Sequence, residues 1–160
     1  MATSDDVVGA VKTLLQSAMA DDPPNVLEQG FAPTFKLKDI IGKRVYVFSV
    51  GSKTLSSLTR GQDLEEQKIV VAVIDKYVSP ARGDQDERVP EDWIIERKTF
   101  VADKVHEVLD NVGLRGVAKL LGVYWTDRCE ITIDVDRDAL TEDKVFRSEV
   151  EIDFRGIVAA

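Results

Sequence analysis

The sequence predicts an α+β domain: a largely antiparallel four-stranded sheet with helices packed on one face, in the order α-β-β-α-β-β. Three observations favour this class. Residues 145–154 (VFRSEVEIDF) alternate strictly between the two faces of a half-buried strand. Residues 67–78 (QKIVVAVIDKYV) form the longest β-type run, apolar on both faces at its centre, and indicate a central strand. The run before the last strand, 129–135, is its expected partner, because a connection of about ten residues suits antiparallel neighbours.

The first elements follow from local patterns. Apolar residues recur every three or four positions between Val7 and Met19, which predicts a helix over about 5–19 capped by Ser4. Residues 44–50 (RVYVFSV) predict a strand from their β-branched and aromatic content. Between these elements, residues 26–43 support only a short helical turn at 37–41. Polar, Pro- or Gly-containing stretches predict connections. These connections are 21–25, 51–63, 79–92 and 136–144.

The second long helix is expected over residues 93–111 (WIIERKTFVADKVHEVLDN). Its apolar residues keep helical spacing with Lys98 as the one polar break, Asp92 as the cap and Gly113 as the stop. For residues 114–122 the sequence allows either a second short helix or a connection. The final strand is expected to turn one set of side chains to the core. That set is Phe146, Ser148, Val150, Ile152 and Phe154.

Length and composition indicate one domain over residues 1–160, with its sheet and helix core at about 31–156. A chain of 160 residues buries roughly 70% of its unfolded surface. No apolar run approaches the length of about 20 residues that spans a membrane, and the N-terminus lacks a signal peptide's basic region. The single cysteine, Cys129, fits a reducing compartment such as bacterial cytoplasm.

The chain is acidic. Lys and Arg number 21 against 29 Asp and Glu, a net charge of -8. Gripping nucleic-acid phosphates needs clustered Lys and Arg, so that class of function is disfavoured. An acidic surface could line a passage that DNA crosses without sticking, but solubility is the simpler explanation of the charge.

One enzyme hypothesis rests on Asp75, Glu96 and Lys98. They match part of the Asp…Glu-x-Lys pattern of metal-dependent nucleases, in which two carboxylates hold the metal and the lysine positions the attacking water. That geometry requires residues 93–98 to be a strand. The helical period through this region is the stronger signal and would point Glu96 and Lys98 to different sides.

Two binding motifs are incomplete. Asp134, Asp136, Asp138 and Glu142 suggest a calcium loop, but the glycine and the twelfth-position Glu of that loop are missing, which favours a solvated connection. Residues 51–54 (GSKT) contain only part of a phosphate-binding loop, since the first glycine is absent and Ser52 separates glycine from lysine. We therefore expect no metal and no cofactor.

Four further side chains have ordinary structural explanations. His106 has neighbouring carboxylates but no nucleophile or second base placed by the sequence, which favours a helix-surface role. Cys129 alternates with Ile131 and is expected to be a buried small apolar residue. Trp93 and Trp125 fit either core or interface positions.

The order of segments resembles a known family. An N-terminal amphipathic helix precedes FAPTFKLKDIIGKRVYVFSVG; SLTRGQDLEEQKIVVAVIDKY, the helix DWIIERKTFVADKVHEVLDN and a strand pair ending in VFRSEVEIDFRG follow. Over about residues 31–156 this pattern resembles the tail terminator (tail completion) proteins of long-tailed bacteriophages and, more loosely, their neck and head-completion relatives. The likeness is one of element order without an invariant motif, and the connection at 114–124 has no counterpart in it.

The resemblance implies a structural virion protein of the tail or neck, present in host cytoplasm during assembly. Such proteins form a homo-oligomeric ring, commonly a hexamer, that caps the tail tube and presents a surface to the head-side connector or neck protein. It implies no reaction, no cofactor, no membrane and no specific nucleic-acid binding, although DNA crosses such rings. The rival hypotheses are the metal-dependent nuclease, a head-completion or neck protein, and a non-viral α+β binding module.

Overall fold

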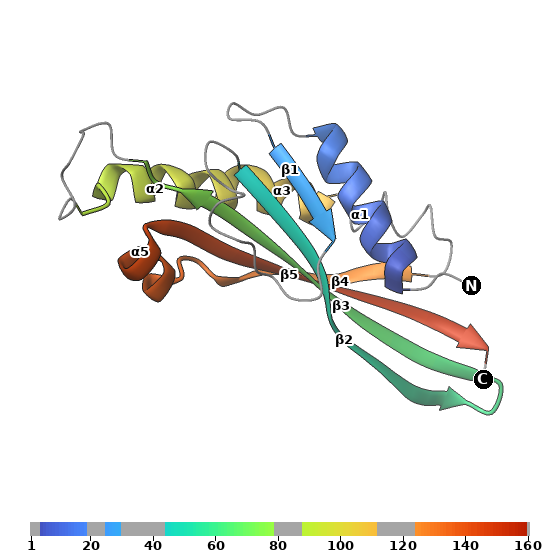
Figure 1. Ribbon diagram of the computed structural model, residues 1–160. Coiled ribbons are helices and arrows are strands. Elements are labelled where there is room, and N and C mark those ends of the chain that lie inside the picture. Colours follow the sequence, from blue (N-terminus) through green and yellow to red (C-terminus); the bar gives the residue numbers. More distant parts are fainter. Residues whose placement is uncertain (1–3, 19–24, 30–43, 79–87, 112–123, 160) are drawn as a thin grey trace.

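The computed structural model describes residues 4–18, 25–29, 44–78, 88–111 and 124–159. Within these ranges it contains helices and one sheet (Figure 1). In chain order the elements are α1 (Ser4–Ala18), β1 (Asn25–Gln29), β2 (Arg44–Thr59), β3 (Gln62–Lys76), α2 (Glu91–Phe100), the π-helical segment η2 (Val101–Val105), α3 (His106–Asn111), β4 (Tyr124–Ile133), α5 (Arg137–Asp143) and β5 (Val145–Ala159). The expected turn at 37–41 and the open segment 114–122 lie outside the described residues.

The sheet has the strand order β1-β2-β3-β5-β4. Along β2, β3, β5 and β4 each strand is antiparallel to its neighbour, so the predicted four-stranded antiparallel sheet is confirmed, with β3 at its centre and β4 beside β5 as expected. The fifth strand, β1, was not predicted; it lies parallel to the first five residues of β2. β1 has only five residues and follows a proline-rich linker, so its local sequence pattern is weak. Its pairing partner also lies 19 residues later in the chain, as in Asn25 against Arg44, and cannot be seen locally.

The main core lies between the sheet and the long helices. The predicted inner face of the last strand is confirmed, since all five of its side chains are buried. Ser148 is the polar member, and its hydroxyl donates to the Ile133 carbonyl oxygen at 2.8 Å. The helices contribute apolar side chains at helical spacing. These are Val7, Val8, Val11 and Leu15 of α1, with Val101, Val105 and Leu109 of η2 and α3.

A smaller apolar cluster lies on the other face of the sheet, where Ala139 of α5 packs on it. Its buried members are Val45, Val47, Ala72, Ile74 and Val145. The sequence assigned residues 136–144 to a connection, and this was wrong over α5. The Asp136 carboxylate accepts from the Ala139 N–H at 3.1 Å as the N-cap, and Lys144, at φ 55°, ends the helix. The acidic composition of residues 136–144 suggested a solvated connection, whereas the segment forms a short capped helix.

The predicted helix over residues 93–111 is confirmed as α2, η2 and α3 in succession. Its start differs from the prediction: Pro90 is the N-cap, without a side-chain hydrogen bond, and Asp92 lies in the first turn. The wider π-helical turn buries Val101 and Val105 against the sheet. None of the described helices is long and apolar enough to cross a membrane.

The connection predicted at 51–63 was also wrong. Residues 50–59 continue β2, Arg60 and Gly61 form a two-residue turn, and β3 begins at Gln62. Serine, threonine and glycine suggested a loop, whereas here they belong to a hairpin exposed on both faces. β5 extends beside it to Ala159, so the C-terminal segment left unassigned by the sequence is a strand. We call residues 50–64 and 155–159 the arm; in Figure 1 it projects beyond the helices.

Candidate functional site

The three residues of the nuclease hypothesis do not converge. Glu96 and Lys98 lie on helix α2, and residues 93–98 are helical. Glu96 pairs with Arg97, and Lys98 pairs with Asp134 at 3.3 Å. The Asp75 side chain is 7% exposed and faces guanidinium groups. The geometry that would hold a metal between Asp75 and Glu96 is therefore not formed.

Asp75 belongs to a buried charge cluster that connects α2 to the sheet. Its Oδ2 lies 3.3 Å from the Arg44 Nε and 3.4 Å from the Arg97 Nε. Each guanidinium also stacks on an aromatic ring, Arg44 at 4.0 Å from the Phe100 centroid and Arg97 at 4.3 Å from that of Trp93. Burial raises the pKa of Asp75, and the attraction of the two arginines offsets part of that rise. A depression of about 250 Å³ adjoins the cluster between α2 and β2.

Trp93 is one of the two tryptophans that the sequence left between core and interface. It packs against the main core, edge-on to Tyr77 at 5.3 Å and to Phe146 at 6.4 Å between ring centroids. These contacts fix the start of α2 beside the start of β5. The side chain of Trp125 lies outside the described part of the chain.

Of the four acidic residues of the calcium hypothesis, Asp134 and Asp136 accept hydrogen bonds from the backbone, and Asp138 and Glu142 lie exposed on α5. Asp134 accepts from the Val135 N–H at 2.8 Å, and this bond with the Lys98 contact lowers the pKa of Asp134. Asp136 caps α5 and lies 3.3 Å from the Arg147 Nη1. Among the described residues, no group of three or more His, Cys, Asp or Glu side chains is placed to hold a metal ion.

The partial phosphate-loop motif at 51–54 is part of strand β2. A register shift occurs between Val50 and Ser52, where a Cβ on Gly51 would lie 3.2 Å from the Val70 Cγ2. The Lys53 Nζ pairs with the buried Glu65 at 3.0 Å. The motif therefore marks a bulge in the hairpin and does not form an anion-binding loop.

His106 and Cys129 connect α3 to β4. The sequence placed His106 on the helix surface, but it is half-buried and its Nε2 lies 3.0 Å from the Cys129 carbonyl oxygen. Cys129 is partly buried and packs against the core, close to the expectation. Burial, with Asp110 and Asp153 nearby, raises the pKa of the Cys129 thiol to about 12. At neutral pH the thiol is therefore protonated and a weak nucleophile.

The face of the sheet opposite the long helices carries mutually paired charges around a depression of about 260 Å³. Arg155 lies 3.1 Å from Glu66, and Arg128 lies 3.1 Å from Asp153. Register places Glu130 opposite Glu151 on the same face, and each contacts its own basic side chain, Arg128 and Lys68 respectively. Because these carboxylates are paired with basic side chains of the sheet, this face supports strand register more directly than ligand binding.

The arm is the feature that sequence reasoning missed. Every residue from Val50 to Gln62 is exposed. It carries four of the exposed large apolar side chains found among the described residues. They are Val50 (39% exposed), Leu55 (61%), Leu58 (49%) and Ile157 (42%). The available signal was the Arg60–Gly61 turn between two β-type runs, which suits a two-residue hairpin loop.

Comparison with known proteins gives no match, either to a protein-family model or to a curated protein. Functional inference therefore depends on the geometry described above and on the resemblance in element order.

Proposed function

We propose that this chain is a ring-forming bacteriophage tail terminator, which caps the tail tube and joins it to the head-side connector. The observation that carries the proposal is the arm. It gives a single small domain a long projecting hairpin with exposed apolar side chains and an exposed strand edge. Projections of this kind on a rigid sheet are suited to contact between subunits.

The physical reason is that an open strand edge is a template for pairing. Proteins that stay monomeric blunt such edges with charges, prolines or covering segments. The β2 edge from Val50 to Thr59 carries one charged side chain, Lys53, and no proline. Among the described residues, the short strand β1 pairs with this edge of β2, and its pairing ends at Phe48. A second subunit or a tube protein would complete this edge.

The order of elements also supports the proposal, since it follows the pattern of the tail terminators over about residues 31–156. The nuclease alternative finds less support. Its carboxylate Asp75 is held by two arginines, and the Arg97 guanidinium contacts both Asp75 and Glu96, so a basic side chain takes the place that a metal ion would need. A structural role in assembly uses the exposed arm and leaves the buried charge cluster as a support for α2.

The direct test is assembly of the purified protein with and without tail tubes polymerised from the tube protein of the same genome. If the ring forms without tubes, size-exclusion chromatography with light scattering should give a mass of about 107 kDa, six times 17.8 kDa. If ring formation needs tubes, the ring should be found on tube ends. Electron microscopy should show the added protein at one end of each tube, and tube growth should stop. A monomer that leaves tubes unbound and growing would overturn the proposal.

Adding the head-side connector to the same experiment distinguishes a tail terminator from a neck or head-completion protein. A protein of that kind should bind the head-side connector while leaving free tube ends unoccupied. A tail terminator should bind the tube end before any connector is added.

A further inference from the structure

We infer that the ring forms head to tail, with the arm of one copy docking on the acidic end of the next. The acidic end comprises residues 88–96, at the start of α2, and 136–144, around α5. This inference rests on the proposed ring function and deepens it by naming the two surfaces that meet.

The β2 edge of the arm is cationic in an otherwise acidic protein. Residues 44–61 contain three basic residues and no acidic one, in a chain of net charge -8. Arg44 is buried and Lys53 is paired with Glu65, whereas Arg60 is exposed at the turn of the hairpin. Leu55 and Leu58 place exposed apolar side chains on the strand that leads to this turn. The edge therefore offers apolar surface next to the positive charge of Arg60, a combination suited to a protein interface.

The opposite edge of the sheet is better protected. At β4, the Cys129 carbonyl oxygen is already engaged by His106 of α3. Exposed Arg128 and Glu130 alternate along that strand, and charged side chains discourage strand addition. Of the two edges, that of β2 is the one suited to a partner.

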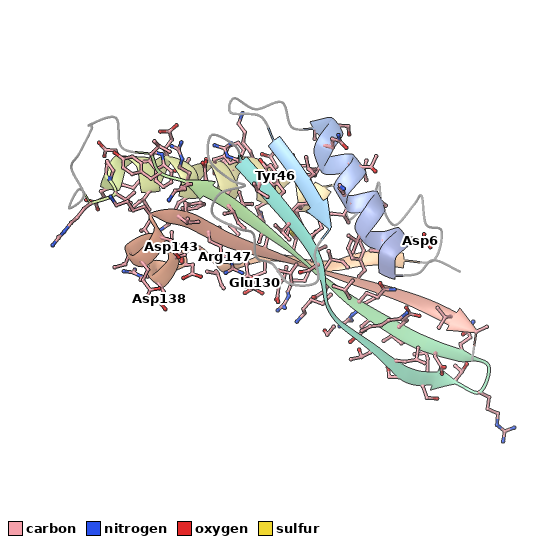
Figure 2. All side chains as sticks on the ribbon, in the orientation of Figure 1. Asp6, Tyr46, Glu130, Asp138, Asp143 and Arg147 are labelled. Carbon is pink, nitrogen blue, oxygen red and sulfur yellow. The ribbon has the colours of Figure 1, made fainter. Side chains whose placement is uncertain are left out.

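The acidic end has the complementary chemistry. Residues 88–96 and 136–144 together contain seven acidic and three basic residues. Two exposed apolar side chains lie near them, Val78 (60% exposed) and Ile95 (52%). On α5, Asp138 and Asp143 lie at the end of the molecule opposite the arm (Figure 2). Opposite charge around apolar contacts favours this surface as the partner of the arm.

The acidic end is also rigidly attached to the sheet. The Lys76 Nζ donates to the Asp143 carbonyl oxygen at 3.0 Å, and the Tyr77 N–H donates to that of Lys144 at 2.9 Å. Trp93 holds the start of α2 against Phe146. A docking arm would meet a preformed surface, so little ordering entropy is lost on binding.

The two surfaces cannot meet within one chain. β3 runs from the arm to the acidic end over 15 residues, which corresponds to about 50 Å at the rise of a strand. Complementary surfaces at opposite ends join different copies, and such a heterologous contact closes into a ring when its rotation permits. Arm-to-arm pairing would instead bring the basic residues of two copies together.

Cysteine trapping between copies tests the pairing. Arg60→Cys on the arm and Glu142→Cys on α5 are made as separate proteins, both at exposed positions. Native Cys129 competes poorly, because its thiol has a pKa of about 12. Mixed under mild oxidation, with and without tubes, the two proteins should form a disulfide-linked dimer on a non-reducing gel. Arg60→Cys mixed with the control Gln16→Cys, exposed on α1, should not.

Charge reversal provides a second test of the pairing. Arg60→Glu and Glu142→Lys should each weaken association by about two- to fivefold, the range of an exposed ion pair. The double variant should recover most of this loss, since the reversed charges again attract across the interface. Circular dichroism of each variant should match that of the parent, because both side chains are exposed.

The outcomes separate this inference from the proposed function. Cross-linking of Arg60→Cys with itself, or an oligomer without the mixed disulfide, would overturn the head-to-tail pairing and leave the tail-terminator proposal standing. The mixed disulfide in a ring that does not bind tail tubes would support the head-to-tail pairing and overturn the terminator role. A protein that stays monomeric with and without tubes would overturn both.

Discussion

Removing one guanidinium from the buried cluster tests the physical account of how α2 is held. Arg44→Met keeps most of the side-chain volume but leaves Asp75 facing Arg97 alone. The two charges lie 3.3 Å apart with side chains 10% and 7% exposed. At an effective dielectric of 20 their gross attraction is about 5 kcal/mol. Breaking a buried ion pair costs about 3–5 kcal/mol, and the remaining Arg97 places this variant near the lower figure, at about 3 kcal/mol.

The assay is urea unfolding at pH 7, followed by circular dichroism. The midpoint should fall while the slope stays unchanged, because the surface exposed on unfolding is the same. Arg44→Met/Asp75→Asn/Arg97→Met is the matched control and should be more stable than Arg44→Met alone, since removing all three charges leaves no buried charge without its partners. A loss below about 1 kcal/mol for Arg44→Met would refute this account of the cluster.

The pH dependence has a defined sign. Burial raises the native pKa of Asp75 above its ordinary value of 3.8, so protonation favours the folded state. The contribution of Asp75 to the free energy of unfolding is therefore largest below pH 3.8, and it is lost as the pH rises through the native pKa. Without Arg44 that pKa rises further. The deficit of Arg44→Met should be greatest at neutral pH and shrink toward pH 4; a deficit independent of pH would contradict this reasoning.

Three further predictions follow from single contacts. Phe146→Ala removes a fully buried ring and should cost about 3–5 kcal/mol in urea unfolding; a cost under about 1 kcal/mol would mean that the site collapses or is not core. Asp136→Ala removes the α5 N-cap and the Arg147 contact and should cost about 1 kcal/mol by the same assay, whereas no change would show that α5 does not depend on its cap. Cys129 should react with iodoacetamide at pH 8 about a thousandfold more slowly in the native protein than in urea, because the native thiol has a pKa of about 12; equal rates would contradict its burial.

Strict periodicity is what made most of the sheet predictable. The alternation over 145–154 identified both faces of β5, because a one-residue shift would expose the whole apolar set. The helical stripe over 93–111 was equally informative. It also disfavoured the nuclease arrangement before the structure placed Glu96 and Lys98 on α2.

Local pattern failed where exposure or distant partners decide the structure. The hairpin of the arm is exposed on both faces from Val50 to Gln62, so these residues lack the alternation that marks a half-buried strand, and the pairing of β3 with β5 cannot be seen in the local sequence. α5 has 7 residues, about two turns, within an acidic run. The Asp75 cluster joins β2, β3 and α2, and no spacing in the sequence brings Arg44 and Arg97 to the same carboxylate.

The central claim is that the projecting arm serves assembly of a ring at the head-proximal end of a phage tail. Cryo-electron microscopy of intact particles tests it most directly. The account predicts a ring of this chain between tube and connector, with residues 50–64 of each copy lying over α5 of its neighbour. Density for the chain elsewhere in the particle, or a ring whose arms touch no neighbouring copy, would contradict it.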